Sequence, residues 1–231
     1  MAWPVLTPGH LIDLLLPDLC RVCGGDTRSA GYCDACAAGL LRHGRQCRAC
    51  GVPVVIDGLC GRCQRRPAPI AETVAPFRYA PPVSEDIHKL KYHRKLACGR
   101  DLGTLLAREL EARLPELPEV LVPVPLHWRR QFQRGFNQSV EIARPVSRIL
   151  GVPIETGLVK RTAYTPPQVG LGPATRRRNL RRAFKTTGAT MPASVAIVDD
   201  VITSGATVAE VARCLRRAGV ETVFVWALVR A

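Results

Sequence analysis

The sequence predicts an α/β protein with a mostly parallel sheet flanked by helices, and a small cysteine-rich zinc domain at its N-terminus. In residues 67–231, short strands alternate with helical patterns, and the strands are continuously apolar. Such strands are typical of a parallel sheet that helices cover on both faces. Eight of the ten cysteines fall into four Cys-x-x-Cys pairs before residue 64. We therefore expect a double zinc-ribbon-like module over residues 1–66 and an α/β domain over residues 67–231.

The four Cys-x-x-Cys pairs predict two structural zinc ions. Two thiolates on one tight turn can point at a tetrahedral ion, and a second pair completes a closed Cys₄ site. The expected ligands are Cys20, Cys23, Cys33, Cys36, Cys47, Cys50, Cys60 and Cys63. A sequential assignment gives the first four to one ion and the last four to the other, but a crossed assignment also satisfies the spacing. Redox pairs are disfavoured because no thioredoxin-like βαβ pattern surrounds the cysteines.

The larger domain begins after a proline-rich linker. Its expected elements, in chain order, are a strand ending near 77–79, a short helix capped by Ser84, a helix over 101–114, a strand at 119–125, a helix from about Gln138, weak strand signals at 152–160, a strand at 194–200, a helix from about Ala206 to Gly219 and a last strand at 221–229. Pro145 has no evident place inside the helix from Gln138, since proline removes a helical hydrogen bond. Cys214 is expected to be a buried thiol.

The stretch VAIVDDVITSGATV, residues 195–208, carries the clearest functional signal. A buried strand ending at Val198 would place Asp199 and Asp200 at its carboxyl end, where open α/β sheets bind ligands. The following loop leads directly into a helix, so its backbone N–H groups suit a phosphate. Paired carboxylates suit vicinal hydroxyls, or waters on a Mg²⁺ ion. A nucleoside triphosphatase is disfavoured because the chain has no G-x-x-x-x-G-K-[ST] loop.

The same stretch resembles the phosphoribosyl diphosphate (PRPP) signature of type I phosphoribosyltransferases. The segments VPVPLHWRRQFQRGFNQS (122–139), RRNLRRAF (177–184) and LKY (90–92), with the four cysteine pairs, are similar to the ComF family of competence-associated proteins. The resemblance covers nearly the whole chain. It implies a type I phosphoribosyltransferase-like fold, PRPP with Mg²⁺ as ligand, and a role in DNA uptake, natural transformation or nucleotide metabolism.

The resemblance also assigns roles to residues. Asp199 and Asp200 would bind the ribose hydroxyls, and the 5′-phosphate would lie on Thr203, Ser204, Gly205, Ala206 and Thr207. A basic segment at about 160–180 would close over the site. The recurrent family positions are Lys91, Arg134, Gln138, Arg161, Gln168, Arg176 and Asn179. Of these, we expect the three arginines to stabilise the departing pyrophosphate, because catalysis needs cations where charge develops.

The net charge indicates the kind of partner, and the N-terminal sequence indicates the location of the protein. The net charge is +14; residues 1–66 carry 8 basic and 5 acidic side chains, so most of the excess belongs to residues 67–231. An excess of this size favours anionic partners, although a solvated arginine-rich surface is the alternative. The N-terminus has no basic region before an apolar run, and no run reaches the roughly 20 residues that span a bilayer. We expect a cytoplasmic protein without membrane insertion.

Two functions remain open from the sequence. One is a Mg²⁺-dependent phosphoribosyltransferase whose acceptor is unknown. The other is a PRPP-sensing or single-stranded-DNA-binding module with little turnover, acting with other DNA-uptake proteins. Trp128, Phe132 and Phe136 are the best candidates for stacking on bases.

Overall fold

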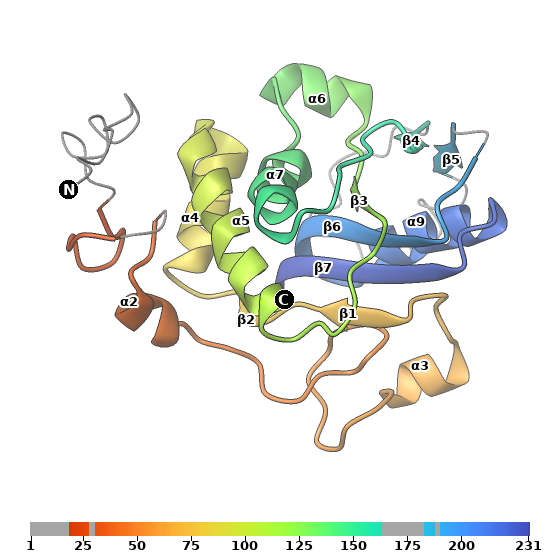
Figure 1. Cartoon of the computed structure of the whole chain (residues 1–231), viewed down its shortest axis with the longest axis horizontal. Coiled ribbons are helices and arrows are strands. Elements are labelled where there is room, and N and C mark those ends of the chain that lie inside the picture. Colours follow the sequence, from red (N-terminus) through yellow and green to blue (C-terminus); the bar gives the residue numbers. More distant parts are fainter. Residues whose placement is uncertain (1–18, 28–30, 163–182, 188–189) are drawn as a thin grey trace, which may run out of the picture.

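The computed structural model describes residues 19–27, 31–162, 183–187 and 190–231 (Figure 1). The described helices are α2 (Asp34–Ala38), α3 (Gly61–Arg65), α4 (Val83–His93), α5 (Leu96–Glu111), α6 (Trp128–Arg134), α7 (Gln138–Leu150) and α9 (Ala206–Arg217). The described strands are β1 (Glu72–Val74), β2 (Phe77–Arg78), β3 (Val120–Pro123), β4 (Val159–Arg161), β5 (Phe184–Thr186), β6 (Ser194–Ile202) and β7 (Thr222–Arg230).

The main sheet is parallel throughout. Its order is β1-β7-β6-β3, and β2 also pairs with β7. The two long central strands, β6 and β7, run in parallel register, with Val198 opposite Trp226. A separate antiparallel pair joins β4 to β5. The predicted mostly parallel sheet is confirmed.

Helices cover both faces of this sheet because successive strand residues point to opposite sides. Ala196 and Val198 belong to a buried cluster with α4, α5 and α7. Val195 and Ile197 belong to a second cluster with α9, β4 and β5, on the other face. Figure 1 shows α4, α5 and α7 on one side of β6 and β7 and α9 on the other. The strand sequences are therefore continuously apolar because both of their faces are buried.

Pro145, which has no evident role in the sequence, is buried inside α7 against α5. A Cβ atom at Gly103 of α5 would overlap both the Pro145 ring and the Ile142 carbonyl. At Gly99, one turn earlier, a Cβ would lie 2.8 Å from that of Glu141. The two glycines let α7 approach α5 closely, and the proline ring fills the contact that they open.

The cysteine-rich residues are tied to the α/β core rather than separate from it. Tyr32 is buried in the cluster of α4 and α5, and its hydroxyl donates to Asp86 Oδ2 at 2.9 Å. Arg21 Nε donates to Asp101 Oδ2 at 2.6 Å. Further along, Thr73 Oγ1 donates to the Ala49 carbonyl at 3.0 Å. The division into two domains near residue 66 stays a prediction.

Two predicted boundaries differ from the structure. β6 continues to Ile202 rather than stopping at Val198, because its pairing with β7 extends to Ile202 opposite Arg230. α4 begins at Val83 with Pro82 as its N-cap, so Ser84 does not cap it. The Asp86 N–H donates to the Pro82 carbonyl at 3.1 Å, so the helical hydrogen bonds begin before Ser84.

Candidate functional site

The acid pair lies near the carboxyl end of β6, close to the position that the sequence predicts. Asp199 and Asp200 are only 8% and 3% exposed. Because unpaired buried charges are costly, their partners decide whether this arrangement is stable. Ser139 Oγ donates to Asp199 Oδ1 at 3.2 Å, and Lys91 forms an ion pair with Asp200 Oδ2. The paired acids are therefore held by side chains from α4 and α7.

A chain of polar contacts extends from Asp200 to α6. Gln138 Nε2 donates to Asp200 Oδ1 at 3.4 Å. Its Oε1 accepts from Arg134 Nη1 at 2.9 Å. Lys91 lies near the end of α4, Arg134 at the end of α6 and Gln138 at the start of α7. The structure thus brings together residues that the sequence predicts for the site, each from a different element: Lys91 of α4, Arg134 of α6, Gln138 of α7 and Asp200 of β6.

Burial and charge oppose one another at this cluster. Burial lowers the pKa of Lys91, but the charges of Asp200 and Asp199 outweigh it, so the Lys91 pKa is raised and its ammonium form is favoured. Burial, and then the charge of Asp200, raise the pKa of Asp199 well above the ordinary aspartate value. In the absence of a ligand, Asp199 therefore retains its proton at a higher pH than an exposed aspartate.

The loop between β6 and α9 is shaped to present backbone groups. Gly205, at the N-cap of α9, has φ +71°, a conformation that glycine adopts readily. Ser204 Oγ accepts from the Ala206 N–H at 3.3 Å. Thr203 is exposed, and Ser204, Gly205 and Thr207 are half-buried. The first N–H groups of a helix have no partner within that helix, so this loop suits an anion.

Two arginines that sequence reasoning missed hold this loop from outside. Arg230, near the end of β7, donates from Nη1 to the Ile202 carbonyl at 3.1 Å and also bonds the Thr203 carbonyl. Arg62 of α3 donates from Nη1 to the Ser204 carbonyl at 3.3 Å. Neither residue has a sequence signal, because each reaches the loop only through tertiary packing.

The segment RGFNQ, residues 134–138, runs from the end of α6 to the start of α7. Gly135 has φ +80°. Asn137 is the N-cap of α7: its Oδ1 accepts from the Ser139 N–H at 3.0 Å, and its Nδ2 donates to the Val124 carbonyl at 3.0 Å. Asn137 therefore fixes Gln138 and Ser139, which contact the acids, relative to the end of β3.

The basic segment from the sequence is only partly described. Arg161 lies in β4, with its guanidinium carbon 5.6 Å from the centre of the Phe184 ring. Gln168, Arg176 and Asn179 lie outside the described residues. The roles of all four residues stay predictions.

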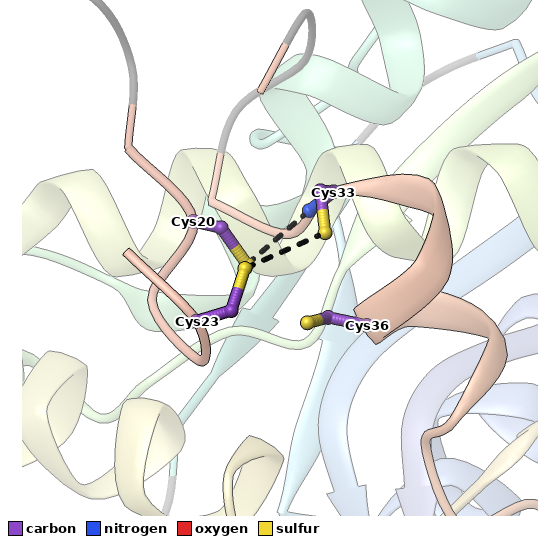
Figure 2. Close-up of side chains that lie close together, drawn as sticks. All are labelled: Cys20, Cys23, Cys33 and Cys36. Atoms are coloured by element: carbon purple, nitrogen blue, oxygen red, sulfur yellow. Dashed lines mark hydrogen bonds between the residues drawn. The ribbon is translucent and has the colours of Figure 1, made fainter. Parts of the chain in front are cut away.

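The eight paired cysteines form two groups, and each group can hold one metal ion. Cys20, Cys23, Cys33 and Cys36 make one group, Cys47, Cys50, Cys60 and Cys63 the other, and within each group the ligand atoms lie within 4.8 Å of one another. Figure 2 shows the first four side chains converging on one point. This geometry selects the sequential assignment over the crossed one. A closed set of four thiolates is typical of structural zinc.

The two groups repeat the same local structure. The Cys33 N–H donates to Cys20 Sγ at 3.4 Å, and the Cys60 N–H donates to Cys47 Sγ at 3.2 Å. Burial raises the pKa of Cys20, but backbone N–H groups of Cys33, Cys23 and Val22 outweigh it and lower the pKa to about 6. Thiolates are the zinc-binding form, so the lowered pKa favours metal binding at Cys20, whereas hydrogen bonds with neighbouring thiols raise the pKa of Cys36 in the same group.

Metal analysis tests the two zinc sites. We expect about two zinc ions per chain. A Cys60→Ser variant should retain about one, because loss of the Cys60 thiol affects only the second group. Cys214→Ser, a change at a buried thiol of α9 outside both groups, is the control and should retain two. Equal zinc contents in the two variants would contradict the assignment.

Comparisons with known proteins agree with these features. Residues 11–64 match the double zinc ribbon domain family. The DNA utilization protein YhgH of Escherichia coli (strain K12) is 39% identical over 94% of this chain and 99% of its own. Competence protein F of Haemophilus influenzae is 33% identical over 92% of this chain and 90% of its own.

A more distant similarity links the chain to a phosphoribosyltransferase. Amidophosphoribosyltransferase of Escherichia coli (strain K12) is 30% identical over 135 residues, or 58% of this chain and 24% of its own. Within the described residues, no helix is both long and apolar enough to cross a membrane. The chain has a mostly parallel sheet flanked by helices, two Cys₄ groups and a distant similarity to a phosphoribosyltransferase. It belongs to the ComF family, which includes competence protein F and YhgH.

Proposed function

We propose that the carboxyl end of β6 and the start of α9 bind PRPP together with Mg²⁺. The observation that carries this proposal is the arrangement of Asp199 and Asp200 beside the loop of residues 203–207. The loop offers backbone N–H groups to the 5′-phosphate, and the carboxylates accept hydrogen bonds from the ribose diol. The identity to amidophosphoribosyltransferase supports the same ligand.

The cations around the acid pair fit the rest of the ligand. Lys91 and Arg134 lie on either side of Asp200 and Gln138, and Mg²⁺ would neutralise further phosphate oxygens. Charge develops on pyrophosphate when the bond to the ribose C1 breaks, so positive groups at this point favour transfer. Arg161 and Arg176 are proposed to add to this charge. Pyrophosphate release with a panel of nucleobases distinguishes a transferase from a PRPP sensor.

The proposed cellular role is in DNA utilization, including DNA uptake in natural transformation, together with other DNA-uptake proteins. It rests on the names of the relatives and on the net charge of +14. In this role the PRPP site would link DNA handling to the supply of nucleotide precursors. The protein would act in the cytoplasm.

A second function, binding of single-stranded DNA, is favoured by the surface around α6. Trp128 and Phe132, four residues apart on one helix, are 65% and 87% exposed. Tyr92 is 65% exposed, and the Arg134 guanidinium carbon lies 5.6 Å from the centre of its ring. Exposed aromatic rings beside arginines are the usual platform for unpaired bases. Phe136, the third sequence candidate, instead packs against the core.

Asp200→Asn tests the PRPP site. The change removes the charge that accepts from the ligand, so PRPP affinity should fall about tenfold or more. Titration calorimetry with Mg²⁺ measures it, with the exposed Glu116→Gln as the matched control. Because Asp200 also pairs with Lys91, thermal unfolding must show that the variant is folded. Thr207→Ala should weaken binding without disturbing that ion pair, and unchanged affinity in both folded variants would contradict the site.

The raised pKa of Asp199 predicts a pH dependence of binding. Burial and the charge of Asp200 keep Asp199 protonated in the free protein above the ordinary aspartate pKa. Diol hydroxyls donate to the ionised form, so binding expels the proton and affinity should rise as the pH increases through the raised pKa. Asp199→Asn, which cannot ionise, should bind PRPP more weakly and should lose this rise of affinity with pH. Calorimetry in buffers of different ionisation enthalpy measures the protons released on PRPP binding. Equal proton release by the wild type and Asp199→Asn would contradict the role of Asp199.

Phe132→Ala tests the α6 surface. Loss of one stacking ring should weaken binding of a fluorescent oligothymidine by about tenfold, as expected for 1–3 kcal/mol per stacked base. Val55→Ala is the control, because Val55 is an exposed aliphatic residue of the second zinc ribbon, which holds Cys47, Cys50, Cys60 and Cys63. Wild-type affinity should also fall steeply with salt because arginines contact phosphates. A flat salt response, or no effect of Phe132→Ala, would remove α6 from DNA binding.

A further inference from the structure

A cavity of about 510 Å³ lies between α9 and the zinc ribbon that holds Cys47, Cys50, Cys60 and Cys63. Its walls come from α3, the linker that follows it, the end of β6, the loop of Ser204 and Gly205, and α9 along its length. Ligand sites for small molecules commonly have volumes of about 300–1,000 Å³. The cavity therefore has the size of a small-molecule site, and neither Asp199 nor Asp200 lines it.

The floor of the cavity is apolar and built from short or branched side chains. Ile70, Ile202 and Ala206 belong to the buried core, and the half-buried Ala209 adds the surface of α9. Alanines on one helix face leave a flat surface, because no long side chain stands on it. A flat apolar floor suits a planar ring.

The rim carries a strong excess of positive charge. Arg62, Arg66, Arg213 and Arg217 face the cavity with a single carboxylate, that of Glu210. Glu210 is already satisfied: Arg213 Nη2 lies 2.7 Å and Arg217 Nη2 3.7 Å from its oxygens. Among the described residues, no hydrogen bond or ion pair involves the side chain of Arg66. The rim thus offers Arg66, which has no such partner among the described residues, and Arg217, whose contact with Glu210 is long at 3.7 Å.

We propose that this cavity binds a nucleoside monophosphate. Its base lies on the alanine floor of α9, and its phosphate bonds Arg66 and Arg217, since a guanidinium binds phosphate in a bidentate manner. This site is separate from the acid pair and does not depend on the binding of PRPP. Arg62 links the two, because it lines the cavity and donates to the Ser204 carbonyl. Ser204, Gly205 and Ala206 of the loop proposed to hold the 5′-phosphate also line the cavity, so a nucleotide there contacts that loop.

Titration calorimetry with AMP, GMP, CMP and UMP on the full chain loaded with zinc tests the proposal. At least one should bind, while inorganic phosphate and ribose 5-phosphate, which lack the base, bind at least tenfold more weakly. Arg66→Gln and Arg217→Gln should each weaken binding by about tenfold. Arg148→Gln, which removes one exposed charge on α7, should bind as the wild type does. Ala209→Trp should abolish binding because the ring fills the cavity, with thermal unfolding as the check on folding.

Two further outcomes decide the location. Asp200→Asn should leave nucleotide binding intact, whereas loss of binding in Asp200→Asn with retention in folded Ala209→Trp would place the nucleotide at the acid pair and overturn the proposal. Failure of all four nucleotides to bind at millimolar concentration would also overturn it. Equal binding of inorganic phosphate and nucleotides would reduce the cavity to an anion site and contradict the role of the floor. None of these outcomes depends on whether PRPP binds.

Discussion

The ion pair between Lys91 and Asp200 is the contact on which the rest of the site depends. Two adjacent carboxylates buried in a strand are costly unless charges and hydrogen bonds compensate for them. The compensation comes from Lys91 of α4 and from Gln138 and Ser139 of α7. Gly99 and Gly103 let α7 pack closely on α5, on the same face of the sheet. The helix packing on one face of the sheet and the polar cluster therefore support each other.

The zinc ribbons contribute to the same architecture. The first contributes Tyr32 and Arg21, which bond buried aspartates of α4 and α5. The second lies against the start of α9, where Arg62 bonds the loop after β6 and the Cys50 carbonyl accepts from Arg230, which bonds that loop as well. Zinc fixes each ribbon, because the free energy of binding a structural metal is also free energy of folding. A structural metal in the second ribbon thus helps to shape the proposed phosphate loop.

Much of the fold and part of the site could be predicted from the sequence. The apolar strands, the acid pair, the glycine-containing loop and the cysteine pairs are local patterns, and the structure has each of them. Contacts between distant residues gave no such signal. The support of the loop by Arg62 and Arg230 depends on packing between segments far apart in the chain. Pro145 is explained only by its neighbour Gly103, and the end of β6 only by its partner β7. Local patterns also did not separate Phe136, which is packed, from the exposed Phe132.

The central claim is that one strand end and one helix start together hold a sugar phosphate. A crystal structure of the protein with PRPP and Mg²⁺ tests it most directly. The 5′-phosphate should lie within hydrogen-bonding distance of the backbone N–H groups of residues 204–207, with the ribose diol on Asp199 and Asp200. A phosphate bound to Arg66 and Arg217 without contact to these N–H groups, or ribose hydroxyls away from both aspartates, would contradict it.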